Sequence, residues 1–447
     1  MAEKPLAVII LAAGQGSRMQ SELPKVLHRL AGVPLIGHAL AAARSLEPDD
    51  VIVVAGHGAA KVEKATAKLE PDARIVLQQE QLGTGHAVRQ AMPLLEGFDG
   101  KVIVLYGDTP FIGEDTLAAL ASHGADLVVL GFEAEDPGRY GRLVITDAGL
   151  ERIVEYKDAD EATRMIALCN SGVMALDAGL LRNLIGKLTN DNAAGEYYLT
   201  DLVALARAEG RRADVVTCDE EETLGINTRA ELAAAEAGFQ ARARVSALEN
   251  GVTLTDPATV WFSLDTAIGR DAVIGQNVVF GPGVTIESGA EVLPFCHLEG
   301  CHISSGATVG PFARLRPGAE LGSEVHVGNF VEIKNAVLDE GVKVGHLTYL
   351  GDSHIGEHAN IGAGTITCNY DGVMKHRTEI GANAFIGSDT MLVAPVRVGE
   401  RAVTGSGSVI TEDIEEGALA LGRARQVTKP GLGIRLMQAL RAQKEKS

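Results

Sequence analysis

A short stretch near the N-terminus combines glycines and cations in a pattern suited to binding a phosphate chain. An apolar run ends in Leu11–Met19, which reads LAAGQGSRM, and Lys25 follows in the sequence LPKVL. The two glycines allow backbone amides to approach phosphate oxygens, and Arg18 and Lys25 add positive charge where a triphosphate would lie. Two glycines after a strand also suit a plain tight turn, but the two cations favour the phosphate-binding interpretation.

Two further segments follow apolar runs and carry polar groups. Val102–Tyr106 ends in Gly107 and Asp108, and a carboxylate at a strand end beside phosphates is a natural ligand for Mg²⁺. The segment Gln78–His86 offers amide side chains and open backbone that could read the edge of a pyrimidine base. Asp108 could instead be a turn residue, and Thr84 could cap a helix that follows it.

The second half of the chain carries a different set of candidate residues. Arg316 and Lys334 lie eighteen positions apart in a region where apolar residues recur every sixth position. If three six-residue sides make one turn of a coil, these cations project side by side from one edge and could hold a sugar phosphate. His346 lies twelve positions further on, a whole number of sides, and we expect it in the same cleft. A histidine can accept the proton of an attacking amine near neutral pH. A solvated charge stripe and a corner histidine are the simpler alternatives.

A cysteine-histidine segment, Cys296–His302, superficially suggests zinc. Its Cys-His pairs are five residues apart, which matches no usual ligand spacing, and alternate residues of a strand face opposite sides. We therefore expect no zinc site there.

The residues of the second half are positioned by the repeat itself. The period of six fits neither a helix nor one long strand, and it predicts a parallel β-helix with apolar residues inside and Gly, Asn or Asp at the corners. The segment Thr367–Thr378 breaks the period and is predicted to be a loop thrown out from a corner. Flat repetitive faces favour assembly into a trimer, and an oligomerisation stem without catalytic function is the simpler alternative. The apolar positions are Ile268, Ile274, Phe280, Ile286, Val292, Leu298, Ile303, Val309, Leu315, Leu321, Val327, Ile333, Leu338, Val344, Leu350, Ile355, Ile361, Ile380, Ile386, Leu392 and Val398.

The first half alternates short apolar runs with helical patterns. This alternation predicts a parallel sheet covered on both faces, with ligands at the carboxyl ends of the strands. The predicted strands are Leu6–Leu11, Val51–Ala55, Ile75–Leu77, Val102–Tyr106 and Leu127–Phe132, and the predicted helices are His38–Leu46, Ala59–Leu69, Gly85–Leu95 and Asp115–Ala121. An Ala- and Glu-rich segment, Thr228–Asn250, is predicted to be a solvated connecting helix. The expected domains are residues 1–229, a linker helix at 230–250, and residues 251–447.

Composition narrows the possible functions. The chain has 447 residues and a formal charge of −19, which disfavours binding to nucleic acid or to anionic membranes. The five cysteines are scattered and odd in number, which indicates reduced thiols and a cytoplasmic location. The apolar run near the N-terminus leads into a glycine turn rather than a cleavage site, so we do not interpret it as a signal peptide. No apolar run approaches the roughly 20 residues of a spanning helix, so we expect no membrane insertion.

These motifs carry a resemblance to a known family. The stretch Leu11–Met19 with Pro24-Lys25 is similar to the signature loop of sugar-nucleotide pyrophosphorylases. Joined to the six-residue repeats, it resembles the bifunctional bacterial uridylyltransferases and acetyltransferases that make UDP-N-acetylglucosamine for cell-wall and lipopolysaccharide synthesis. The resemblance implies a Rossmann-like nucleotidyltransferase domain followed by a left-handed parallel β-helix, and a homotrimer. It also implies the substrates glucosamine 1-phosphate, acetyl-CoA and UTP, with Mg²⁺ as cofactor.

The resemblance assigns roles to individual residues. Arg18, Lys25 and His346 would be catalytic, with Asp108 and Asn227 holding the metal. The UTP and UDP-sugar site would consist of Leu11, Ala12, Ala13, Gly14, Lys25, Gln78, Gly83, Thr84, Tyr106, Gly107, Asp108, Gly141, Glu155, Asn170 and Asn227. The acetyl acceptor would be bound by Arg316, Lys334, Tyr349, Asn360 and Lys375, and acetyl-CoA by Ala363, Asn369, Tyr370, Ser388, Ser406 and Arg423. Lys375 is expected to reach a neighbouring subunit's site.

Two positions depart from the family pattern, and two simpler functions stay open. Ser406 replaces a common alanine and Ser17 a usual threonine, and we expect both changes to tune contacts without removing activity. One alternative is a single-activity nucleotidyltransferase whose β-helix only assembles or regulates it. The other is a non-catalytic sensor of sugar nucleotides.

Overall fold

The computed structural model describes residues 5–445 and divides into two compact units between Phe239 and Gln240. The boundary falls inside helix α8, Arg229–Glu249, which spans the predicted linker region. The helix is not simply a solvated spacer. In the first unit Ala235 is buried in a cluster with Met19 and Ile226, and in the second unit the buried Gln240 side chain exchanges two hydrogen bonds with the backbone of Phe262, at 2.7 and 2.8 Å.

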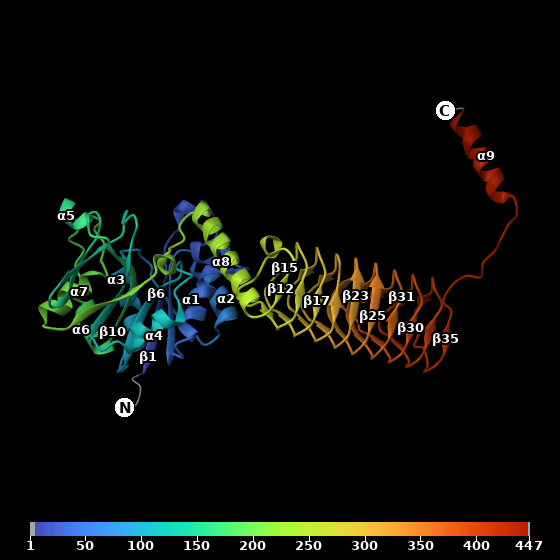
Figure 1. Ribbon diagram of the computed structural model, residues 1–447, viewed down its shortest axis with the longest axis horizontal. Coiled ribbons are helices and arrows are strands. Elements are labelled where there is room, and N and C mark those ends of the chain that lie inside the picture. Colours follow the sequence, from blue (N-terminus) through green and yellow to red (C-terminus); the bar gives the residue numbers. More distant parts are fainter. Residues whose placement is uncertain (1–4, 446–447) are drawn as a thin grey trace. The chain divides into compact units, whose positions relative to one another are not determined.

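The first unit is built on a sheet with strand order β11-β7-β10-β6-β1-β4-β5, to which the hairpin β8–β9 is attached (Figure 1). Its strands are β1 Leu6–Ala12, β4 Asp50–Ala55, β5 Arg74–Leu77, β6 Lys101–Tyr106, β7 Leu127–Glu133, β8 Arg142–Thr146, β9 Gly149–Val154, β10 Leu168–Asp177 and β11 Ala213–Cys218, and β2 Arg29–Leu30 pairs separately with β3 Val33–Pro34. Its helices are α1 Leu35–Arg44, α2 Ala59–Leu69, α3 Thr84–Ala91, α4 Glu114–Ser122, α5 Glu161–Arg164, α6 Ala178–Ile185 and α7 Asp201–Ala208, with 3₁₀ turns η1 Ser17–Met19, η2 Lys25–Leu27, η3 Met92–Leu95 and η4 Glu220–Thr223.

The sheet is mixed rather than wholly parallel. β1 is parallel to β4 and β6, as predicted, but β10 runs antiparallel to β6 and β7. The chain passes from β7 to β10 through the β8–β9 hairpin and the single-turn helix α5. That route lacks the long crossover helix that joins parallel neighbours, so the returning strand pairs antiparallel.

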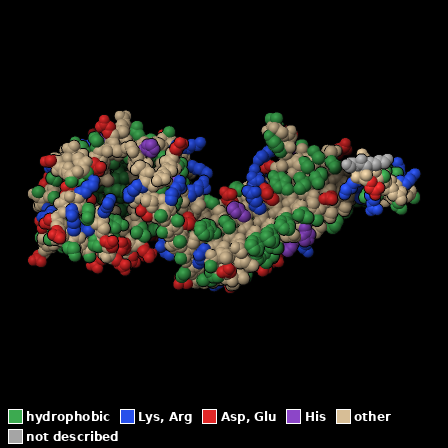
Figure 2. Space-filling view, turned by 90° about the horizontal axis from the view of Figure 1, so that it is seen from above, with side chains coloured by type: hydrophobic (Ala, Val, Ile, Leu, Met, Phe, Trp, Pro, Cys, Tyr) green, Lys and Arg blue, Asp and Glu red, His purple; other side chains and the backbone are tan. Residues whose placement is uncertain are grey.

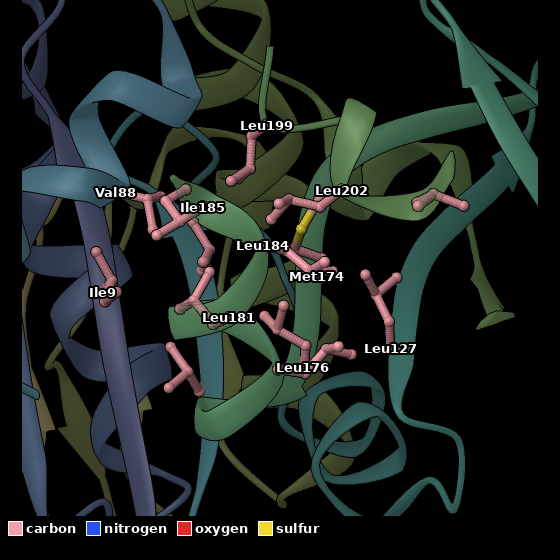
Figure 3. Close-up of a cluster of buried hydrophobic side chains, with 14 of the residues drawn as sticks. Ile9, Val88, Leu127, Met174, Leu176, Leu181, Leu184, Ile185, Leu199 and Leu202 are labelled. Carbon is pink, nitrogen blue, oxygen red and sulfur yellow. The ribbon is translucent and has the colours of Figure 1, made fainter. Parts of the chain in front are cut away.

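Both faces of the sheet are covered, as the continuous apolar strands predict. Ile9 and Leu11 of β1 face one core with residues of α3, α6 and α7, whereas Val8 and Ile10 face a second core with residues of α1, α2 and α4. Figure 3 shows Ile9 and Val88 in the first core, together with Leu181 and Leu184 of α6 and Met174 and Leu176 of β10. This burial on both sides holds the strand ends, and the loops that follow them, in fixed positions.

The second unit is a left-handed parallel β-helix whose coils have three sides (Figure 1). Strands stack into three faces, and β24 and β26 each continue around a corner from the first face to the second. Face A consists of β15 Val279–Phe280, β18 His297–Leu298, β21 Arg314–Leu315, the starts of β24 Glu332–Leu338 and β26 Tyr349–Ile355, β28 Ile366–Cys368, β31 Met391–Val393 and β34 Val409–Ile410. Face B consists of β13 Ala267–Ile268, β16 Val284–Ile286, β19 Cys301–Ile303, β22 Ala319–Leu321, the ends of β24 and β26, β29 Thr378–Ile380 and β32 Val396–Val398. Face C consists of β12 Thr253–Leu254, β14 Val273–Ile274, β17 Glu291–Val292, β20 Thr308–Val309, β23 His326–Asn329, β25 Lys343–His346, β27 Asn360–Ile361, β30 Phe385–Ile386, β33 Val403–Thr404 and β35 Leu419–Ala420.

The predicted repeat accounts for the interior of these coils. From Ile274 to Val398 every predicted apolar position is buried, whereas Ile268 in the first coil is only half-buried. Outside the faces lie the 3₁₀ turn η5 Pro257–Thr259 and the exposed helix α9 Leu432–Lys444.

The predicted loop is shorter than the break in periodicity indicates. Thr367 belongs to β28 and Thr378 to β29, so the insertion loop runs over residues 369–377. Thr367 is fully buried inside the coil. Its hydroxyl tolerates this burial because it accepts a hydrogen bond from the Gly351 backbone amide at 2.7 Å and donates one to the Gly351 carbonyl oxygen at 3.1 Å. A satisfied hydroxyl can occupy an interior position that the period reserves for apolar residues.

Candidate functional sites

The carboxyl ends of β1 and β6 border a cavity of about 300 Å³ in the first unit. Ten predicted nucleotide-binding residues line it: Leu11, Ala12, Ala13, Gly14, Lys25, Gln78, Gly83, Thr84, Tyr106 and Asp108. Gln81, which also lines the cavity, belongs to the predicted segment Gln78–His86, whereas sequence reasoning assigned no role to the lining residues Val26, Ala87 and Glu196. Ala87 follows that segment directly, and Glu196 reaches the site from a distant segment without a strand-end signal.

Lys25 joins the two predicted metal ligands. Its ammonium group forms an ion pair with the Asp108 carboxylate and donates to the Asn227 amide oxygen at 2.9 Å. The Asn227 amide nitrogen donates to the Gly225 carbonyl at 3.1 Å, which keeps the oxygen turned towards Lys25. Two hard oxygen donors therefore converge on one cationic group, and this donor set fits Mg²⁺, which takes one or two protein oxygens besides phosphates and waters.

The three predicted sugar-binding residues lie together on neighbouring elements. The Gly141 carbonyl accepts a hydrogen bond from the backbone N–H of Asn170 at 2.9 Å, and a Cβ at Gly141 would lie 3.5 Å from the Glu155 carboxylate oxygens. Glu155 accepts a hydrogen bond from the Thr200 hydroxyl at 3.2 Å, and burial raises the pKa of its carboxyl group. The nearby Tyr106 is also affected, since burial raises the pKa of its phenol. These polar groups lie close to one another and could accept hydrogen bonds from sugar hydroxyls.

The loop between β5 and α3 is held by close backbone packing. Gly83 has φ +104°, and a Cβ there would lie 2.7 Å from the Tyr197 carbonyl oxygen, so no other residue fits without strain. The suggestion that Thr84 caps the helix is wrong. Gly83 occupies the N-cap position, and the Thr84 hydroxyl instead accepts a hydrogen bond from the Leu199 amide at 3.1 Å.

Arg18 lies apart from the residues that line the cavity. It is exposed on η1, and its neighbour Gly16 has φ +63° and packs closely on the Lys25 side chain. Gly107 continues β6, with its amide donating to the Leu11 carbonyl at 2.9 Å. The loop therefore brings Lys25 to the cavity, whereas Arg18 faces the solvent beside it.

A cation cluster marks the corner between faces A and B of the second unit. Arg316 lies on the coil before Lys334, with its amide donating to the Ile333 carbonyl at 2.8 Å, as the spacing of eighteen predicts. Lys375 of the insertion loop lies beside Lys334 of its own chain, and the charges of Lys375 and then Arg316 lower the pKa of Lys334. Glu332 offsets part of this charge through an ion pair with Arg316 at 2.8 Å. Three cations crowded at a surface form an anion site.

His346 does not stack with these cations, so the expectation of a single cleft on one edge is wrong for the isolated chain. It ends β25 on face C, where its coil neighbour is Asn329, and lies at the corner between faces C and A. The physical reason is that twelve residues make two sides of a coil and eighteen make three. The exposed imidazole contacts the Asn329 amide oxygen through Nδ1 at 2.5 Å.

The remaining predicted acceptor residues are also distributed over several faces. Tyr349 lies on face A with its phenol over Gly351, beside the Asn369 amide. Asn360 lies on face C, one coil beyond Lys343. Asn369 bonds Asp352 at the base of the insertion loop, and Tyr370 is exposed on that loop, with its hydroxyl donating to the Gly372 carbonyl at 2.6 Å. One chain therefore does not bring all the acceptor residues into a single pocket.

Four of the six predicted acetyl-CoA residues form a row below His346 on the same corner, whereas Asn369 and Tyr370 belong to the insertion loop. The Gly364 amide donates to the His346 carbonyl at 3.3 Å, the Asp389 amide to the Ala363 carbonyl at 2.7 Å, and the Gly407 amide to the Ser388 carbonyl at 2.8 Å. Arg423 completes the row by donating to the Ser406 carbonyl at 2.9 Å. An extended ligand could therefore lie along successive coils and end at His346.

The coils before His346 expose stacked aromatic rings on the same corner. Phe295, Phe312 and Phe330 each have positive φ, and neighbouring ring centroids lie 5.0 and 5.3 Å apart. Their exposed fractions of 48%, 46% and 55% are large for phenylalanine, and Leu347 extends the row at 61%. Figure 2 shows several groups of hydrophobic side chains on the visible face of this unit. Such a row on a rigid edge is typical of an interface.

The cysteine-histidine segment has the geometry of a coil wall. Cys296 and Cys301 are buried inside, whereas His297 is exposed and His302 lies between Glu287 and Glu320 on the outside, with nitrogen-oxygen distances of 3.1 and 3.5 Å. Within residues 5–445, no three His, Cys, Asp or Glu side chains are grouped as metal ligands. In the same range, no helix is both long and apolar enough to cross a bilayer.

Comparison with known proteins identifies both halves. Residues 8–179 match the MobA-like NTP transferase domain family, and residues 377–412 match the bacterial transferase hexapeptide (six repeats) family. The chain is similar to the protein named Bifunctional protein GlmU in three bacteria. It is 78% identical to that of Paracoccus denitrificans over 99% of this chain and 100% of the relative. The identity is 67% for Cereibacter sphaeroides (100% and 99% covered) and 53% for Paramagnetospirillum magneticum (100% of both).

The fold and the two matched domains define a nucleotidyltransferase joined to a hexapeptide-repeat transferase. With such identity over its full length, the chain belongs to the GlmU family of bifunctional proteins.

Proposed function

We infer that this chain acetylates glucosamine 1-phosphate with acetyl-CoA in its second unit. Its first unit then transfers uridylyl from UTP to the resulting N-acetylglucosamine 1-phosphate, which gives UDP-N-acetylglucosamine and pyrophosphate. The observation that carries this inference is that one chain of the family brings together two separate groups of predicted site residues, Lys25 with Asp108 and Asn227 in the first unit and Arg316 with Lys334 and Lys375 in the second.

Acetyl transfer needs a base and a phosphate anchor. In this proposal Arg316, Lys334 and Lys375 bind the phosphate of the acceptor while its amine attacks the thioester carbonyl. A C–N bond forms and the C–S bond breaks. The exposed imidazole of His346 accepts the amine proton and returns it to the leaving sulfur, so that coenzyme A departs as the thiol, and the Nδ1 contact with Asn329 sets the orientation of the ring.

Uridylyl transfer depends on alignment and charge neutralisation. A phosphate oxygen of N-acetylglucosamine 1-phosphate attacks the α-phosphorus of UTP, and the bond to the departing pyrophosphate breaks. Lys25 neutralises charge on the phosphates at the cavity, and Arg18 adds charge at its solvent side. Asp108 and Asn227 would hold Mg²⁺, which supplies further charge neutralisation when bound.

In this proposal Gly141, Glu155 and Asn170 select the sugar by binding its hydroxyl and acetamido groups. Gln78, Gly83 and Thr84 would read the uracil. Because the acetamido group is made in the second unit, a pocket that requires it orders the two reactions.

We also propose that the chain acts as a homotrimer in the cytoplasm. The acceptor residues of one chain are distributed between two corners, and the phenylalanine row beside His346 is left exposed, so packing of copies along this row would complete each acetyl-transfer site. Acetyl-CoA would then lie along Ala363, Ser388, Ser406 and Arg423 beside a neighbouring copy. The five unpaired cysteines suit a reducing compartment.

The test is a reconstitution with omissions. Purified protein receives glucosamine 1-phosphate, acetyl-CoA, UTP and Mg²⁺, and each component is left out in turn. Without acetyl-CoA, pyrophosphate release from glucosamine 1-phosphate should be lost and should return when N-acetylglucosamine 1-phosphate is added. A single-activity nucleotidyltransferase would never release coenzyme A, and a sensor would release neither product.

A further inference from the structure

His86 occupies a position between two glutamine amides beside the nucleotide cavity. It lies in the first turn of α3 and is half-buried. Its Nδ1 lies 3.0 Å from Nε2 of the buried Gln78, and its Nε2 lies 3.1 Å from Nε2 of Gln90. No role has been assigned to His86 above, although its neighbour Gln78 lines the cavity.

The orientation of the Gln78 amide follows from its partners. The Gly83 carbonyl oxygen, 3.1 Å from Gln78 Nε2, can only accept, so the nitrogen and not the oxygen must face it. The second amide proton then points to His86 Nδ1, which must be the unprotonated nitrogen of the ring. Both protons of Gln78 are consumed, and rotation of the amide would set its oxygen against the Gly83 oxygen.

The second ring nitrogen of His86, Nε2, faces Gln90. A neutral imidazole with an accepting Nδ1 carries its proton on Nε2, and this proton needs an acceptor. Gln90 is the neighbour at that position, with its amide nitrogen 3.1 Å from the ring and 3.2 Å from the His86 carbonyl. Because Gln90 is less buried than Gln78, it is the Gln90 amide that turns to present its oxygen to the ring, at the cost of the contact with the His86 carbonyl.

Gln78 consequently has one polar atom left for a ligand. Within residues 5–445 no donor reaches its Oε1, and the residue lines the cavity. We propose that His86 is a positioning residue that locks Gln78 with its carbonyl oxygen towards the base and so selects uracil over cytosine. This rests on the proposed uridylyl transfer and names the residue that sets its base specificity.

The preference for uracil follows from the hydrogen-bonding groups of the two bases. Uracil carries a proton on N3, which an amide oxygen can accept, whereas N3 of cytosine is itself an acceptor. A fixed Gln78 oxygen therefore binds UTP and repels CTP. Without the His86 acceptor only the Gly83 carbonyl favours this orientation, so the amide turns more readily, can present its NH₂ group to cytosine and loses part of the discrimination.

The experiment compares UTP and CTP in His86→Phe and His86→Asn. Phenylalanine keeps an aromatic ring but has no acceptor. In asparagine Oδ1 is as many bonds from Cα as the imidazole Nδ1, so it can accept the same proton. The measured quantity is the ratio of kcat/KM for UTP to that for CTP, with N-acetylglucosamine 1-phosphate saturating. Acetyl transfer by each variant reports whether the chain is intact.

We expect His86→Phe to lower the UTP to CTP ratio about fivefold, the worth of roughly one hydrogen bond, through a higher KM for UTP and a lower KM for CTP. His86→Asn should restore most of the ratio, and His86→Gln, whose oxygen falls near Nε2, should not. Equal losses for both nucleotides in His86→Phe, with the ratio unchanged, would overturn the proposal. A wild-type protein that turns over neither nucleotide would instead contradict the proposed function itself.

Discussion

The two candidate sites differ in how far one chain completes them. The site in the first unit is a cavity, and its charged groups already contact one another, as Lys25 does with Asp108 and Asn227. The site in the second unit lies on corners, with its cations crowded together and His346 exposed on another edge. In a layered sheet the loops at the carboxyl ends of several strands meet at one point, whereas a β-helix arranges its outward residues along its corners. Uridylyl transfer should therefore need one chain, and acetyl transfer should need several.

The largest expected effect comes from His346→Ala. Acetyl transfer should fall by about 100- to 10,000-fold, the usual contribution of a positioned general base, while uridylyl transfer stays at the wild-type level. Both are measured on the same preparation, by thiol release and by pyrophosphate release. Loss of both activities would mean that the two sites are not independent.

The matching change in the first unit is Asp108→Asn, which keeps the side-chain shape but removes the charge that faces Lys25. Uridylyl transfer should fall by about 100- to 1,000-fold, because a preorganised electrostatic contact is lost, and acetyl transfer should not change. If excess Mg²⁺ restored full activity at unchanged kcat, the carboxylate would contribute only to metal affinity.

Phe312→Asp tests the dependence on several chains. A carboxylate in the exposed aromatic row should dissociate the assembly and reduce acetyl transfer at least about tenfold at low protein concentration, because interface anchors of this kind carry much of the binding energy. Uridylyl transfer should persist, and Phe312→Leu should behave like the wild type. The molecular mass of each variant in solution is measured together with both of its activities. Full acetyl transfer by a monomer would remove the distinction between the two sites.

A smaller effect concerns pH. The pKa of Lys334 is lowered by Lys375 and Arg316, so its charge is lost at a lower pH than that of an ordinary lysine. The KM for glucosamine 1-phosphate should therefore increase on the alkaline side. Lys334→Arg should move this increase to higher pH, because a guanidinium group keeps its proton. An unchanged alkaline profile would show that another group titrates.

The sequence predicts more of the second unit's fold than of its site. A period of six fixes which residues are inside, and the interior from Ile274 to Val398 follows it. The same spacing rule places Arg316 beside Lys334, because eighteen residues make a full turn. It does not place His346 there, because twelve residues make only two sides and end at a different edge. Thr367 escaped prediction because a local hydrogen bond, invisible to hydropathy, lets it replace an apolar residue.

In the first unit the sequence predicts more of the site than of the fold. Strand-end motifs indicated Lys25, Asp108 and the segment around Gln78, and the family resemblance extended the prediction to ten of the cavity residues. The antiparallel β10 and the contribution of Glu196 could not be predicted, since both depend on long connections that carry no periodic signal. The contacts that hold Gly83 against Tyr197 are likewise tertiary.

The most direct test of the central claim mixes two variants. His346→Ala and Asp108→Asn proteins, purified separately as complete assemblies, are combined with glucosamine 1-phosphate, acetyl-CoA, UTP and Mg²⁺, and UDP-N-acetylglucosamine is measured. Each variant alone should form almost none, and the mixture should form it at a rate approaching that of the wild type, because the acetylated intermediate from one protein is used by the other. A mixture as inactive as its components would contradict two independent sites in one chain.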